Sequence, residues 1–136
     1  MMLSVDETAS GYVLLAARIL ISAVFLISGV HKALWREKVA AEFQRDGIPA
    51  INLTLPATVI LHIVASGCII VGWHTREAAL ALAVFTTVAS LKVHAYWRLP
   101  EIEQLARSRV FFANVAIIGG LLLLCVVGPG EISISN

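Results

Sequence analysis

The sequence predicts an all-α membrane protein, an antiparallel bundle of four transmembrane helices with a short interfacial helix after the first. Hydrophobic residues make up 59% of the 136-residue chain. Four apolar segments cover most of it, at residues 12–34, 57–73, 77–97 and 110–128. Each is close to the roughly 20 residues that a helix needs to cross a hydrocarbon core about 30 Å thick. Lipid also requires each segment to satisfy its own backbone polar groups, which favours helices.

The length allows one domain, so we expect residues 1–136 to form a single membrane domain. Asp6 and Glu7 precede an apolar run too long for a secretory signal, so the first helix is expected to stay in the mature protein. The net charge of +1 gives no indication of nucleic-acid binding. Cys68 and Cys125 lack a C-x-x-C spacing and are interpreted as small apolar residues, with a disulfide between their helices as the alternative.

The first predicted helix contains one arginine within its apolar segment and a face of small residues. Arg18 lies about two turns in, where it either extends to the interface or pairs inside the bundle. Ser22, Ser28 and Gly29 are small enough for a neighbouring helix to approach closely. After this helix, Arg36–Asp46 has the apolar spacing of a short amphipathic helix in the interface, ended by Gly47.

The remaining boundaries follow from turn residues. Pro56 suits the start of the second transmembrane helix, and Thr75 is a candidate N-cap of the third, with Arg76 in the same turn. The third helix is expected to end at the aromatic pair Tyr96-Trp97, before a charged loop. Gly128-Pro129-Gly130 predicts the end of the fourth helix.

Lysine and arginine predict the orientation. The first and third connections hold seven of these residues, and the other side holds Arg76 and, if it extends outward, Arg18. Because cytoplasmic loops carry the excess of Lys and Arg, both long loops are expected in the cytoplasm and both termini outside it. The seven are Lys32, Arg36, Lys38, Arg45, Arg98, Arg107 and Arg109.

All four helices are expected to bring polar side chains to the cytoplasmic third of the bundle: Lys32, His62, Lys92, His94 and Asn114. His62 is placed roughly 8–9 Å from the start of its helix. Ionisable residues in a membrane usually face the interior or a cavity and mark function. Each also has a purely structural alternative, namely an extended lysine, a histidine bonded to a backbone carbonyl, or an asparagine joining helices. Their convergence nevertheless predicts a ligand-binding polar pocket.

Several ligands suit such a pocket to different degrees. A quinone head requires donors to its carbonyl oxygens beside an apolar cleft, which these residues offer. Haem or another metal held by His62 and His94 is disfavoured, because the two differ in depth by about 4–5 Å and no carboxylate in the membrane orients them. A transporter or proton pump is weakly supported, because no chain of carboxylates crosses the membrane. No catalytic residue and no metal site is assigned.

The chain resembles the DoxX family of small bacterial four-helix inner-membrane proteins from about Arg18 to Gly130. Arg18-Ile19-Leu20 and Gly29-Val30-His31-Lys32 match the family's first helix, with its G-x-x-K. Gly47-Ile48-Pro49 and the stretch from Gly72 to Leu80, similar to G-x-x-T-R-x-A-A-L, follow. His94 with Trp97 resembles its H-x-x-W, and Asn114, residues 118–121 and residues 128–130 resemble its last helix. Order and spacing together are more specific than any one motif.

Two positions depart from the family pattern. Many members have a Glu where this chain has His62, and a Lys just before the Asn of the last helix, where this chain has Ala113. The joint loss of an opposite-charge pair is consistent, because removal of one partner would leave a buried charge. Lys92 and His62 are a candidate replacement pair.

The resemblance implies a multi-pass protein of the bacterial inner membrane and, more weakly, membrane redox chemistry with quinones. We therefore expect an accessory, non-catalytic subunit of a quinone-linked redox complex, with partner subunits or further copies of itself. The alternatives are an electron-transfer protein that uses His62 and His94, and a transporter of a small solute.

Overall fold

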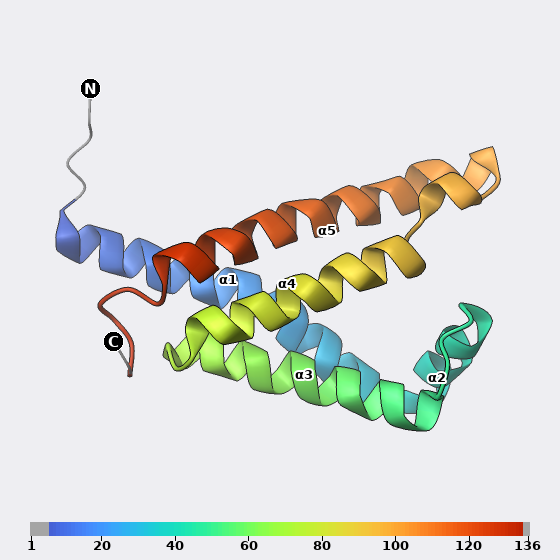
Figure 1. The fold of residues 1–136 in the computed structure, drawn as a ribbon, viewed down its shortest axis with the longest axis horizontal. Coiled ribbons are helices and arrows are strands. Elements are labelled where there is room, and N and C mark those ends of the chain that lie inside the picture. Colours follow the sequence, from blue (N-terminus) through green and yellow to red (C-terminus); the bar gives the residue numbers. More distant parts are fainter. Residues whose placement is uncertain (1–5, 135–136) are drawn as a thin grey trace.

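The computed structural model describes residues 6–134, which form helices joined by short connections and end in a short tail. Four helical segments are long and apolar enough to cross a membrane. They are α1 (Glu7–Leu34), α3 (Ile51–Val71), α4 (Thr75–Lys92) continued by the short helix η1 (Tyr96–Arg98), and α5 (Glu101–Val127). Successive spans run in opposite directions (Figure 1), so the predicted antiparallel four-helix class is confirmed.

The short helix after the first span is also confirmed, as α2 (Arg36–Arg45). It ends as predicted at Gly47, whose φ is +73°. The Gly47 N–H donates to Gln44 O at 3.2 Å, and the Ile48 N–H donates to Phe43 O at 2.9 Å. These two hydrogen bonds together form the Schellman motif, which satisfies the last carbonyls of the helix and turns the chain back toward α3.

Three predicted boundaries were wrong. α3 begins at Ile51, so Pro56 lies inside the helix rather than at its start. α4 ends at Lys92, and Tyr96 and Trp97 belong to η1 instead. The charged loop before the last span is the beginning of α5, because helix formation starts directly after Pro100. At 1.5 Å per residue α5 is about 40 Å long, so its first turns extend beyond a hydrocarbon core about 30 Å thick.

Thr75 is not the N-cap that the sequence suggested. His74 occupies that position with a φ of +47°, and Thr75 is the first helical residue. The Thr75 hydroxyl is buried and has no hydrogen-bond partner within residues 6–134. The tight turn that reverses the chain between α3 and α4 depends instead on Gly72, whose φ is +80°, a value that favours glycine.

The helices form two pairs. α1 packs chiefly on α3, and α4 chiefly on α5, while α3 and α4 meet over a smaller area and α1 touches α5 only locally. The pairs lie close together at the end where α1 begins and α5 ends, and they separate toward the end that holds α2 (Figure 1). We call these the closed end and the open end.

The core lies where the pairs still touch. Ile69, Leu82 and Leu121 are fully buried there, together with Ala79.

Two arginines hold the closed end. Arg18 is only 1% exposed, so it pairs inside the bundle, which was one of its two predicted alternatives. Its guanidinium donates to Pro129 O at 2.5 Å and to Ile70 O at 3.1 Å. Arg76 donates to Cys125 O at 2.9 Å and Val126 O at 2.6 Å. Both side chains thus bind carbonyls at or just beyond a helix C-terminus, where positive charge is favourable.

The small-residue face of α1 acts as predicted at Gly29. A Cβ added there would lie 3.0 Å from His62 Cβ and 3.0 Å from Ile63 Cγ1. α1 and α3 therefore approach closely at this position because Gly29 has no side chain. The contact fixes the part of α3 that carries His62.

Candidate functional site

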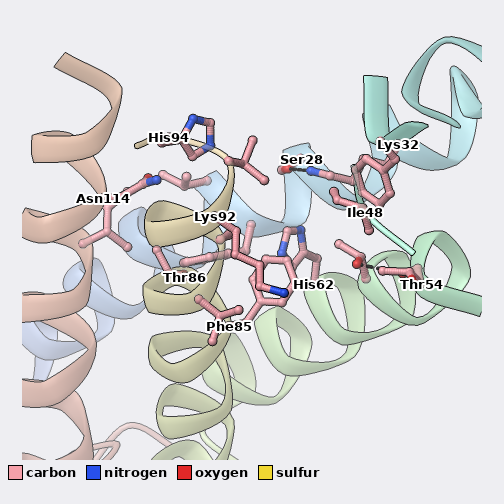
Figure 2. A pocket seen from close by; sticks show the side chains of 18 of the residues that line it. Ser28, Lys32, Ile48, Thr54, His62, Phe85, Thr86, Lys92, His94 and Asn114 are labelled. Carbon is pink, nitrogen blue, oxygen red and sulfur yellow. Dashed lines mark hydrogen bonds between the residues drawn. The ribbon is translucent and has the colours of Figure 1, made fainter. Parts of the chain in front are cut away.

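A cavity of about 450 Å³ lies between the two helix pairs, toward the open end. In Figure 2 one wall holds His94 and Asn114, and the opposite wall holds Ser28, Lys32, Ile48 and Thr54. The lining residues come from α1, the chain around α2, α3, α4 and α5. The separation of the two pairs therefore creates the cavity, and its lining is mainly apolar with a few polar side chains, as is usual for small-molecule sites.

His62 of α3 is one of the buried polar residues that line the cavity. Its imidazole is clamped edge-on by the ring of Phe25 from α1, at a centroid distance of 5.4 Å, and by Phe85 from α4, at 4.8 Å. The residue is 4% exposed, and neither ring nitrogen has a hydrogen-bond partner within residues 6–134. A buried polar group without a partner costs free energy, so the ring is poised to bond a ligand that enters the cavity.

Two lysines contribute the positive charge of the cavity. The ammonium of Lys32 on α1 donates to the Ser28 hydroxyl one turn earlier. Lys92 is the last residue of α4 and lines the same cavity. The predicted replacement pair of Lys92 and His62 is therefore not a direct hydrogen bond, because both imidazole nitrogens are unpartnered. The two side chains line the same cavity and lie between its two walls (Figure 2).

Asn114 of α5 links α5 to α4, the two helices of the second pair. Its amide nitrogen donates to Ser90 Oγ of α4 at 3.1 Å, which matches the structural alternative predicted for it. It also lines the cavity, so one side chain fixes α4 against α5 and takes part in the wall. Thr54, Thr58 and Thr86 bond to backbone carbonyls of their own chain segments, which leaves them little capacity to bind a ligand.

His94 follows the end of α4, in the connection to η1. Its Nδ1 is buried and has no hydrogen-bond partner in the described part of the chain. Within residues 6–134 no group of three or more His, Cys, Asp or Glu side chains is arranged to hold a metal. Haem ligation by His62 and His94 remains the disfavoured alternative that the sequence left open.

The structure thus places all five predicted ligand-binding residues around one cavity: Lys32, His62, Lys92, His94 and Asn114. Their role as ligand-binding groups stays a prediction. The depth predicted for His62 was too small, because α3 begins at Ile51 and His62 is about 16 Å along it.

Sequence reasoning missed the aromatic clamp of Phe25 and Phe85, and also the wall formed by Phe43, Ile48 and Pro49. Phe25 and Phe85 read as ordinary apolar residues of a span. The only signal for the other three was the amphipathic pattern of α2 and its Gly-x-Pro end.

The two cysteines form no disulfide, which excludes that alternative in this structure. The Cys125 thiol donates to Arg76 O at 3.4 Å, so Cys125 takes part in the contact between α5 and the start of α4. Both cysteines are partly buried and pack against the core, as expected of small apolar residues.

Four apolar spans arranged around a mainly apolar cavity with a few polar side chains define a small polytopic integral membrane protein. The protein-family model described as DoxX matches residues 13–95. This chain belongs to the DoxX family.

Three curated relatives cover most of the chain. Inner membrane protein YphA of Escherichia coli is 30% identical over 123 residues, which are 90% of this chain and 88% of that protein. Inner membrane protein YqjF of the same species is 31% identical over 122 residues, with the same two shares. ER-derived vesicles protein ERV29 of Saccharomyces cerevisiae is 28% identical over 133 residues; this chain spans only 36% of its length. No solved structure matches the chain.

Proposed function

We propose that this protein is an accessory subunit of a quinone-linked redox complex in a bacterial inner membrane, and that its cavity binds the quinone head. The observation that carries the proposal is the buried His62, which lines a mainly apolar cavity and whose two nitrogens have no hydrogen-bond partner among the described residues. A quinone carbonyl oxygen accepts the hydrogen bond that a neutral imidazole donates. The aromatic clamp and aliphatic walls suit the ring and the start of its tail.

The placement in the membrane supports the same proposal. The seven lysines and arginines of the long connections lie near the open end, and the two E. coli relatives are inner membrane proteins by name. We place the open end at the cytoplasmic face and both termini outside the cytoplasm, with residues 1–136 as one membrane domain. Partner subunits or further copies of this chain would contact the exposed apolar faces of the spans.

Ligand extraction tests the proposed function. The protein is purified in mild detergent, and organic extracts are analysed for quinone in His62→Leu, in His74→Leu and in the unchanged protein. His74 is the matched control, because it lies in the turn at the closed end and does not line the cavity. Loss of one buried hydrogen bond, of about 1–3 kcal/mol, lowers affinity roughly 5-fold to 150-fold. We expect quinone with the unchanged protein and the His74 variant, and little with His62→Leu.

Two results would refute parts of this proposal. Equal quinone recovery from all three proteins would remove His62 from the site. A protein that carries no quinone, and binds none when it is added to nanodiscs, would remove quinone as the ligand. If the same partner subunit copurifies equally with the unchanged protein and with both variants, the protein would still be an accessory subunit, but that role would not depend on the cavity.

A further inference from the structure

The charged residues that line the cavity favour an anionic ligand over a neutral quinone. Its lining residues include two lysines and two histidines, and no aspartate or glutamate. Lys92 makes neither a hydrogen bond nor an ion pair with any residue that the structure describes. Nothing on the cavity wall therefore balances the positive charge of the two lysines, and charge interactions within a membrane-spanning bundle are stronger than in water.

The nearest carboxylates do not enter the cavity. Glu42 interacts electrostatically with Lys32, but it lies on α2 and faces a separate shallow pocket outside. Asp46 follows α2 and interacts with His94 from outside the lining. Lys32 lines both the cavity and the outer pocket, whereas Glu42 lines the outer pocket and not the cavity, and the two side chains form no ion pair within residues 6–134.

From this arrangement we infer that the cavity selects amphipathic ligands whose head carries a negatively charged oxygen. The inference rests on the proposed function and names the ligand class of the same site. Lys92 and Lys32 attract the charge, and His62, buried and unpartnered, donates to an oxygen of the head. Two sources share this chemistry: an ionised quinone or hydroxyquinone, and the phosphate of an anionic lipid.

A pair of probes tests the charge directly. One is 2-hydroxy-3-alkyl-1,4-naphthoquinone, at a pH where its hydroxyl is ionised, and the other is the neutral 2-methoxy analogue with the same tail. Binding to the full chain is measured in nanodiscs of zwitterionic phosphatidylcholine, after correction for partitioning into empty discs. We expect the anion to bind about tenfold tighter than the ether, because a cation at close range stabilises an anion more strongly inside a protein than in bulk water.

Variants of the two lysines test whether these residues cause the preference for the anionic probe. Lys92→Met and Lys32→Met keep the length and the apolar stem of the side chain, and each should reduce the ratio of anion affinity to ether affinity severalfold. Lys38→Met is the matched control, because Lys38 is exposed on α2 and does not line the cavity. A preference that persists in both cavity variants would overturn the inference.

The lipid arm separates the two sources. Phosphatidylglycerol added to the discs should displace the neutral ether if a lipid phosphate occupies the cavity, because the ether does not respond to surface charge. Displacement of the ether by phosphatidylglycerol supports a lipid phosphate as the occupant. If phosphatidylglycerol displaces nothing and the ionised quinone stays tightly bound, a quinone is supported as the occupant. Equal binding of the two probes overturns the charge inference and leaves the proposed quinone site standing. Failure of both probes to bind to a folded protein, with no lipid retained, refutes the inference and the proposed function together.

Discussion

The close approach of α1 and α3 at Gly29 makes a sharp prediction about stability. In Gly29→Ala the new methyl group would lie 3.0 Å from both His62 Cβ and Ile63 Cγ1, which is closer than ordinary van der Waals contact. Because His62 Cβ is bonded directly to the α3 backbone and cannot rotate away, the two helices must move apart by a few tenths of an ångström. Overpacking of this kind costs about 1–3 kcal/mol.

Two other glycines serve as controls for the helix backbone. Gly67 and Gly119 also lie within spanning helices, and an added Cβ meets nothing within 4 Å at either position. Replacement by alanine changes the intrinsic helix preference at all three sites by a similar amount, up to about 1 kcal/mol. The difference between Gly29→Ala and the two controls therefore isolates the steric cost, which we expect to be about 1–3 kcal/mol.

Unfolding by SDS in mixed micelles, followed by circular dichroism, measures this difference. We expect Gly67→Ala and Gly119→Ala to unfold at the same SDS fraction as the unchanged protein or higher, and Gly29→Ala to unfold at a lower fraction. Because Gly29 contacts the segment that carries His62, quinone recovery should fall in the Gly29 variant as well. A Gly29→Ala protein as stable as the two controls would show that α1 and α3 do not meet this closely.

Further predictions concern the closed end, the second helix pair and the orientation. Arg18→Met should lower the free energy of unfolding by about 2–4 kcal/mol, because two carbonyl acceptors inside the bundle lose a charged donor; SDS titration checks this. A double-mutant cycle of Asn114→Ala with Ser90→Ala should give a coupling of about 0.6 kcal/mol, and a value of zero would show that their 3.1 Å hydrogen bond is not formed. Cysteine introduced at His74 should react with a membrane-impermeant maleimide added outside intact cells, and cysteine at Lys38 should not, in a background without the native cysteines; the reverse pattern would invert the proposed orientation.

The sequence was sufficient to predict the four spans and the short helix after the first. Segment length and hydropathy are local properties, and lipid imposes helix on any long apolar segment. The helix ends were less predictable. Pro56 suggested a helix start, yet α3 begins earlier, and the Thr54 hydroxyl bonds to Pro49 O at 2.7 Å within that first turn. The charged residues before the last span suggested a loop, although Glu101 and Glu103 suit the first turn of a helix.

The polar members of the candidate site were predictable and its shape was not. Lys32, His62, Lys92, His94 and Asn114 stand out because polar residues are rare in spans. That they surround a cavity depends on the pairing of α1 with α3 and α4 with α5, which no single segment encodes. Phe25 and Phe85 carry no polar signal, so their contact with the His62 ring could be found only in three dimensions.

The joining of the helix pairs at one end has a mechanical consequence for ligand size. The two pairs are tied together at the closed end, where Arg18 of α1 binds Pro129 O just beyond the end of α5. A rotation of about 5° there displaces the far end of a 20-residue helix, about 30 Å long, by about 2.6 Å. The width of the cavity therefore depends also on residues at the closed end that do not line it. Under the proposed function, a change at the closed end alone should alter the bulk of the ligand that the cavity admits.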